Sequence, residues 1–233
     1  MCIINFIKDE GVLLVENFLA FRLEEIPFVV ITLVIAFSLH EFAHAYVAYK
    51  FGDDTAKRQG RLTLNPMSHL DPLGTLFILL LGFGWAKPVP VNRNKFKRPR
   101  LAGVLVSIAG PLSNLLLAFI AVFIYFLTIK LGVYTQLPQF FIDLFYVFLN
   151  LNIVLFIFNL LPIPPLDGYR IIEDLVPIRT RIKMQEFEKY AVLIFLVIVI
   201  TPISDYTIGP IFSTVIPSVV DMLVQITSTI LGF

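Results

Sequence analysis

The chain has 233 residues, of which 58% are hydrophobic and only 15% are charged, and its formal net charge is +1. Soluble globular domains average about 45–50% apolar and about 25% charged residues, so this composition excludes an ordinary soluble fold. We expect the chain to lie in a lipid bilayer and to have no nucleic-acid partner. The single cysteine, Cys2, allows neither an internal disulfide nor a cysteine-based metal site.

Five charge-poor stretches approach or exceed the roughly 20 helical residues that are needed to cross about 30 Å of hydrocarbon. They cover residues 27–49, 101–129, 140–161, 190–203 and 206–233. The fourth stretch is short and needs flanking residues to cross. The sequence therefore predicts an all-α polytopic membrane protein with five to six transmembrane helices.

A sixth apolar run, residues 73–83, has about half the length of a spanning helix and contains Gly74 and Gly82. We expect it to form a short re-entrant or β-hairpin element that follows the first core helix without crossing the membrane. Residues 1–26 mix carboxylates with apolar side chains and lack the basic start of a cleaved signal, so we expect an amphipathic or interfacial segment.

Positive charge is concentrated in three connections between the apolar stretches. Of the 18 Lys and Arg residues, four lie in residues 50–61, six in 87–100 and five in 170–189. The positive-inside bias places these three connections in the cytoplasm. We expect a multi-pass protein of a prokaryotic inner membrane, with a catalytic core over 27–168 and a cytoplasmic loop with C-terminal transmembrane helices over 169–233.

His40, Glu41 and His44 lie inside the first apolar stretch. Residues four apart share one face of a helix, so both imidazoles can bind one zinc ion while Glu41 acts as the general base. Ionisable groups in a transmembrane helix cost roughly 2–3 kcal/mol each and are functional by default. The competing interpretation is a chance match in which the histidines are satisfied by neighbouring helices.

Zinc hydrolases usually have three protein ligands and leave the fourth position to water, so a third ligand is required. A run with three prolines, residues 159–168, ends the stretch that begins at residue 140, and non-helical backbone at this depth is tolerated where it lines an internal site. This run presents Asp167. His69, the only other histidine in the sequence, remains an alternative ligand, a gate residue or a capping side chain.

Two asparagines in apolar stretches, Asn114 and Asn159, are candidates for stabilising an oxyanion or holding substrate backbone, and the alternative is that each bridges helices. Residues 86–91, with Pro88 and Pro90, could present an edge to an extended substrate peptide. A purely structural hairpin is the alternative. We expect the acidic pair Glu173 and Asp174 to be solvated in the cytoplasmic loop.

These residues together resemble the site-2 proteases, intramembrane zinc metalloproteases that cleave transmembrane segments in regulated signalling. The resemblance covers about residues 27–168 and includes the pair of histidines with Glu41, the Leu166 to Gly168 motif, residues 110–114 and Asn159. It implies a three-helix catalytic core that holds one zinc ion through His40, His44 and Asp167. The length suggests the compact branch, which lacks a PDZ or nucleotide-binding CBS domain.

The leading hypothesis is therefore an intramembrane zinc endopeptidase that acts on transmembrane protein substrates. The rival is a membrane transporter or metal-handling protein, because ionisable groups in transmembrane helices also mark ion pathways. Glu41 favours the protease, since a carrier has no need of a general base beside two histidines with zinc-ligand spacing.

Overall fold

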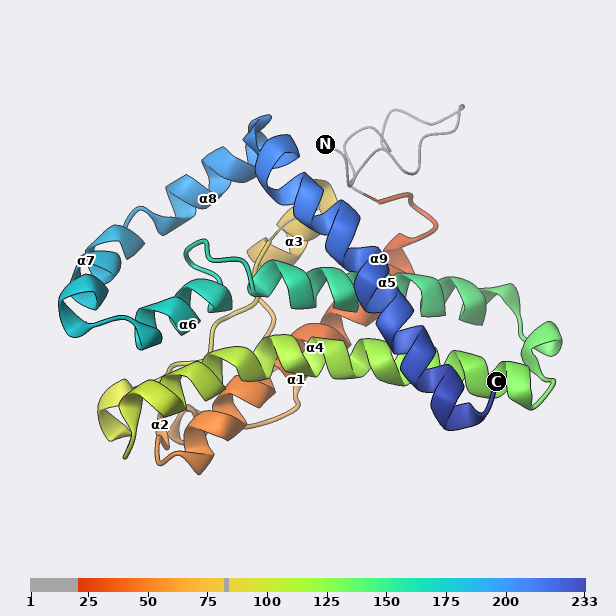
Figure 1. The fold of residues 1–233 in the computed structure, drawn as a ribbon, viewed down its shortest axis with the longest axis horizontal. Helices are drawn as coiled ribbons and strands as arrows, with labels where there is room; N and C mark the ends of the chain where they lie inside the picture. The colour runs from red at the N-terminus through yellow and green to blue at the C-terminus, as the bar shows by residue number, and fades with distance from the viewer. Residues whose placement is uncertain (1–20, 82–83) are drawn as a thin grey trace.

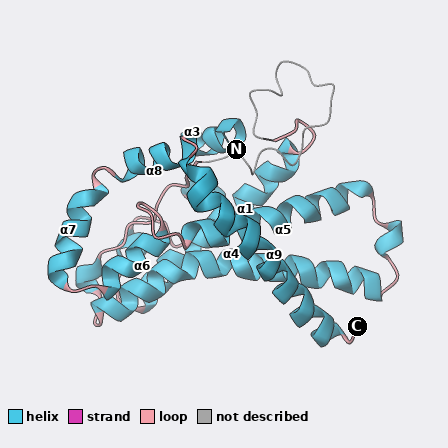
Figure 2. Ribbon diagram, turned by 45° about the horizontal axis from the view of Figure 1, so that its top comes forward, coloured by secondary structure: helices cyan, strands magenta, loops and turns pink. Residues whose placement is uncertain are grey.

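The computed structural model describes residues 21–81 and 84–233, and every regular element within these ranges is a helix (Figure 1, Figure 2). The four long helices are α1 (Ile26–Lys50), α4 (Pro99–Lys130), α5 (Gln139–Asn159) and α9 (Ile203–Leu231). The shorter helices are α2 (Thr55–Arg58), α3 (Pro72–Leu81), α6 (Asp167–Leu175), α7 (Ile178–Glu188) and α8 (Ala191–Ile200), and single 3-10 turns lie at Pro66–Ser68, Arg93–Lys95 and Tyr134–Gln136.

The four long helices are apolar and long enough to cross a membrane. A helix satisfies all of its backbone hydrogen bonds internally, which is what the hydrocarbon interior requires. The chain is therefore an integral membrane protein. The described residues contain fewer spanning candidates than the predicted five to six, because the stretch expected at 190–203 forms only α8, ten residues long. Thr201, which has an extended conformation, separates α8 from Pro202, and a proline disfavours the helical conformation for the residue before it.

The element expected at residues 73–83 is the helix α3 as far as Leu81, so the hairpin alternative is wrong for these residues. Seven of its ten residues are apolar and no turn sequence interrupts them, which favours a helix over two short strands. Gly74 in α3 lies against Trp85, where an added Cβ would be 2.0 Å from the backbone oxygen. Residues 82–83, and the first 20 residues of the predicted interfacial segment, lie outside the described residues.

Helices α1, α4 and α5 pack against one another and form the predicted three-helix core, and α9 crosses α4 and α5 (Figure 1). The buried face of α4 is made largely of small side chains, which let neighbouring helix backbones approach closely. These small buried residues are Ala102, Gly103, Ser107, Gly110, Ser113, Ala118 and Ala121. An apolar cluster that joins α4, α5 and α9 closes the other side of the core.

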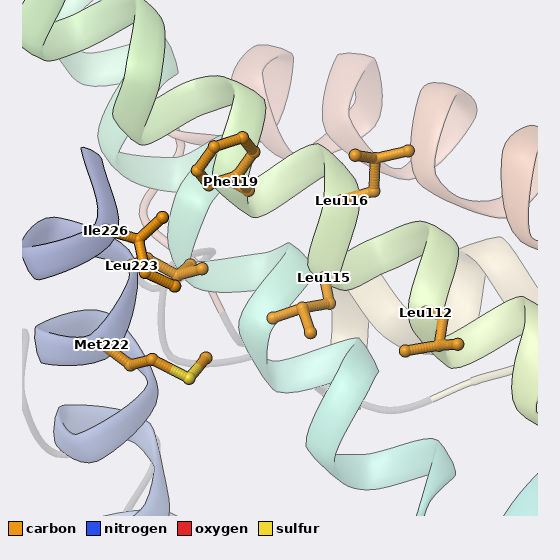
Figure 3. Close-up of a pocket in the computed structure, with 7 residues that line it drawn as sticks. All are labelled: Leu112, Leu115, Leu116, Phe119, Met222, Leu223 and Ile226. Atoms are coloured by element: carbon orange, nitrogen blue, oxygen red, sulfur yellow. The ribbon is translucent and has the colours of Figure 1, made fainter. Parts of the chain in front are cut away.

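An apolar pocket lies between α4 and α9 (Figure 3). Its lining consists of Leu112, Leu115, Leu116, Phe119, Met222, Leu223 and Ile226. None of these side chains can titrate or offer the nitrogen, oxygen or thiolate ligands that zinc requires, so the chemistry of the protein has to be sought elsewhere.

The connection after α5 turns back so that α6 begins beside the end of α5. Pro162, Pro164 and Pro165 prevent α5 from continuing as a helix. Gly168 makes the close return possible, since an added Cβ there would be 2.2 Å from the Leu160 backbone oxygen. Because of this return, α6 packs on α4 and its first residue, Asp167, faces the core.

The acidic pair Glu173 and Asp174 is buried, at 1% exposure each, and the prediction that these groups are solvated is wrong. Two arginines form ion pairs with them: Arg93, which is distant in the sequence, and Arg181, which lies in the next helix. Burial raises the pKa of the Asp174 carboxyl, and the nearby charges of Arg93 and Arg181 act in the opposite direction. The sequence near α6 contains no sign of this burial, because one of the arginines is 80 residues away.

Candidate metal centre

The two histidines of α1 point to the same side of the helix, and their Nε2 atoms are 3.0 Å apart. Both residues are buried, at 7% and 8% exposure, and face α4. Gly110 of α4 provides the space for them. A Cβ at this position would be 2.3 Å from His44 Nε2 and 2.6 Å from His40 Cε1. A glycine is therefore required wherever α4 passes this close to the two rings.

The hydrogen bonds of the Nδ1 atoms leave both Nε2 atoms free to bind a metal. His44 Nδ1 lies 2.6 Å from the Val106 carbonyl oxygen, which can only accept, so His44 Nδ1 must carry the proton. His40 Nδ1 lies 2.7 Å from Asn114 Oδ1 and donates to it in the same way. Each neutral ring then has its lone pair on Nε2, and such partners fix the tautomer and orientation of metal-binding histidines.

Asp167 completes a triangle of electron-pair donors. Its Oδ2 atom lies 3.2 Å from His40 Nε2 and 3.3 Å from His44 Nε2. This oxygen is buried and accepts no hydrogen bond from the described residues. Tetrahedral zinc with bonds of about 2.0–2.1 Å to nitrogen and oxygen requires its ligand atoms to be about 3.3 Å apart. The triangle therefore fits zinc, and these three side chains are the cluster spaced to hold a metal among the described residues.

Glu41, the predicted base, is buried at 7% exposure beside the two imidazoles. Its Oε2 atom accepts a hydrogen bond from the Val89 backbone N–H at 2.8 Å. Val89 lies in a segment without regular secondary structure, between Pro88 and Pro90, neither of which has an N–H. Val89 is thus the single backbone donor at this point of the segment.

Three other residues singled out in the sequence have different hydrogen-bond partners, and one of them contacts a histidine of the metal centre. Asn114 is fully buried between His40 and Asn152. Its Oδ1 accepts the Nδ1–H of His40, and its Nδ2 donates to Asn152 Oδ1 at 3.2 Å. Asn159 donates to the Leu155 carbonyl of its own helix. His69 is fully buried, but its Nε2 lies 2.7 Å from the Thr63 carbonyl, outside the metal cluster.

Sequence reasoning missed the contributions of Val106, Gly110 and Val89 to the metal centre. The Val106 carbonyl and the Val89 amide are backbone groups, which no side-chain pattern can reveal. Gly110 was part of the motif noted in residues 110–114, and a glycine in an apolar helix often marks a close approach. It could have been read as the place where α4 passes the histidines.

Two histidines and an aspartate spaced to hold zinc, beside a buried glutamate and among apolar helices, are typical of membrane-embedded zinc metalloproteases. Comparison with known proteins agrees. Residues 135–202 match the model of peptidase family M50. A Bacillus subtilis protein, "Putative zinc metalloprotease YwhC", is 59% identical over 201 residues, which cover 84% of this chain and 90% of that protein.

Two mycobacterial proteins named "Putative zinc metalloprotease Rip2" are more distant. The one from Mycolicibacterium smegmatis is 32% identical over 70% of this chain and 63% of its own length. The one from Mycobacterium tuberculosis is 32% identical over 72% and 65%. No solved structure matches the chain significantly.

The chain belongs to peptidase family M50, the site-2 protease family, as its sequence motifs predict. The predicted zinc cofactor is confirmed, because the relatives are named zinc metalloproteases and three side chains lie close enough to hold one ion.

Proposed function

We propose that this protein is an intramembrane zinc endopeptidase that hydrolyses peptide bonds in the transmembrane segments of membrane-protein substrates. The observation that carries the proposal is the approach of Asp167 Oδ2 to within 3.2 and 3.3 Å of two imidazoles from a helix more than 120 residues earlier. A transporter has no need of this triangle with a carboxylate base beside it. Family membership supports the same reading.

In this proposal His40, His44 and Asp167 hold the metal. Bound zinc supplies a Lewis acid that polarises the scissile carbonyl and lowers the pKa of a water towards about 7. Glu41 takes a proton from the attacking water and transfers it to the leaving amine. The Val89 N–H holds the Glu41 carboxylate in one orientation, which a base acting at a fixed point requires.

The two asparagines have different parts in the proposal. Asn114 acts through His40, because its amide oxygen accepts the Nδ1–H of that ring. Asn159 is half-buried and lies at the end of α5, just before the turn that leads to Asp167. Its amide is the candidate for stabilising the oxyanion or holding substrate backbone.

A substrate helix has its carbonyls engaged internally and must unwind before cleavage. Residues 86–91, which form neither helix nor strand, are the proposed edge against which the unwound peptide lies. The Val89 N–H is already used by Glu41, and prolines flank it, so this segment offers mainly carbonyl oxygens to the peptide.

The bacterial relatives and the basic connections support a prokaryotic inner membrane with the site near the cytoplasmic side. His44 lies six residues before Lys50, or about 9 Å of helix rise. The catalytic groups would therefore lie a short distance inside the cytoplasmic surface.

The test uses full-length protein in liposomes with a set of synthetic single-span peptides, and mass spectrometry detects cleavage. Glu41→Gln should keep one zinc per chain and lose cleavage by a factor of at least about 100, the lower range for a general base. Asp167→Ala should lose both zinc and cleavage. Tyr46→Phe, on the exposed side of the same helix, is the matched control and should behave as wild type. Unchanged cleavage in Glu41→Gln or Asp167→Ala would refute the proposal.

A further inference from the structure

The segment that contacts Glu41 is anchored on both sides of the contact. Before it, the Lys87 N–H donates to the His69 carbonyl at 2.8 Å. After it, the Asn92 N–H donates at 2.6 Å to Asp53 Oδ2, and Asp53 is fully buried in the connection between α1 and α2. The segment is therefore held at fixed points while its Val89 amide meets the carboxylate.

Arg93 adds a third anchor, and this one reaches a different part of the catalytic core. Its guanidinium lies 3.3 Å from Glu173 Oε2 and 3.0 Å from Asp174 Oδ2. Both carboxylates belong to α6, the helix that begins with Asp167. Asp174 lies seven residues after Asp167, or about 10 Å along the helix axis. Arg93 itself is four residues after Val89.

The acidic end of α6 is fixed against α4. An added Cβ at Gly103 would be 2.2 Å from Asp174 Oδ2, so this carboxylate rests directly on the α4 backbone. Arg181 of α7 lies on the other side, 3.3 Å from Asp174 Oδ1 and 3.5 Å from Glu173 Oε1. The two arginines thus share one pair of acids, but only Arg93 comes from the segment that contacts Glu41.

We propose that Arg93 is a positioning residue that couples the segment holding Glu41 to the helix holding Asp167. This inference rests on the proposed function. A forked guanidinium can bridge two carboxylates, whereas the point charge of a lysine cannot do so with the same geometry. Through this bridge the base and the third ligand keep one relative position, although they lie on elements that are distant in the sequence.

Arg181 provides the matched control because it pairs with the same two acids and is similarly buried, with side-chain exposures of 16% and 22% for Arg181 and Arg93. Losing either arginine leaves the acids with one guanidinium, so a purely structural role predicts the same result for both. The positioning role predicts a result specific to Arg93. Arg100→Ala, at an exposed arginine without a described ion pair, controls for the loss of a surface charge.

The experiment compares Arg93→Ala, Arg93→Lys, Arg181→Ala and Arg100→Ala in full-length, zinc-loaded protein in liposomes. Amide hydrogen exchange over residues 86–93 should be faster by roughly tenfold or more in both Arg93 variants, because local opening exposes the Val89 amide. Their kcat per bound zinc should fall by roughly 10–100-fold, the range for groups that orient metal ligands, with KM changing by less than about twofold. The Arg181 and Arg100 variants should show neither change.

Equal exchange and equal kcat in Arg93→Ala and Arg181→Ala would overturn the inference. Faster exchange in the Arg93 variants with kcat within about twofold of wild type would also overturn it, since the tie would then be only structural. If Arg93→Ala fails to fold, Arg93→Lys decides. If the wild type cleaves no peptide, the proposed function fails separately, and zinc release to a chelator then decides the inference. Faster release in the Arg93 variants than in Arg181→Ala supports the coupling, and equal release refutes it.

Discussion

Gly110→Ala tests whether the metal centre depends on the close passage of α4. The added methyl group would lie 2.3 Å from His44 Nε2 and 2.5 Å from His44 Cε1. Ordinary contacts of a Cβ begin at 3.4 Å, so the imidazole has to move by about 1 Å. The ring cannot move away from α4 without losing a hydrogen bond, because His44 Nδ1–H donates to the Val106 carbonyl of α4.

A misplacement of about 1 Å costs roughly 100-fold in rate, and metal affinity should fall by roughly 10–100-fold. Stability should change little by comparison. Alanine is favoured over glycine in a helix by about 1 kcal/mol, which offsets part of the 1–3 kcal/mol that overpacking typically costs. The expected variant is therefore folded, with reduced zinc content and low activity.

The assay measures zinc per chain by atomic absorption, kcat on a cleavable single-span peptide, and the Tm. Leu112→Ala is the control, because Leu112 lies on the exposed side of the same helix at 46% exposure and should leave zinc content unchanged. A Gly110→Ala protein with one zinc per chain and wild-type kcat would show that the rings do not depend on this passage.

Two further predictions concern the zinc ion and its surroundings. Asn114→Ala should weaken zinc binding by roughly 10–100-fold, because it removes the acceptor that orients His40. Asn150→Ala is the control and should leave zinc binding unchanged, because the Asn150 side chain donates to a carbonyl of its own helix. Equal zinc affinities of the two variants in a competitive titration would contradict the prediction. Removal of zinc with a chelator should abolish cleavage and lower the Tm, and added zinc should restore both, since zinc held at about 1,000 times its Kd stabilises the folded state by about 4 kcal/mol. A chelated protein that remained active would exclude a metal mechanism.

The local part of the metal centre could be predicted from the sequence because helix geometry is local. A spacing of four residues places His40 and His44 on one helix face whatever packs around them. The proline-rich run likewise ends α5 and sets Asp167 at a new helix start, since proline removes a backbone donor. The short length of α8 could also have been predicted from Pro202, which limits the helix, but the apolar composition of residues 190–203 favoured a longer spanning helix.

The burial of Glu173 and Asp174 could not be predicted, because it depends on Arg93 and Arg181, which meet only after folding. The Val106 carbonyl that orients His44 is equally invisible, since every residue has a carbonyl and only packing selects one. The roles of Glu41 and Asn114 remain predictions that the variants described above test, and the role of Asn159 remains a prediction.

The sequence by itself determined that the chain is a membrane protein, the family to which it belongs, and the residue types that hold zinc. Composition and apolar length indicate the bilayer, and the spacing of the two histidines and the proline-rich motif indicate the zinc ligands and the family. None of these signals depends on how the helices pack. Tertiary structure alone decided which backbone groups fix the imidazoles and how the segment at Val89 is tied to α6. These contacts join residues up to 81 positions apart, and the close packing of α1, α4 and α6 determines which groups meet.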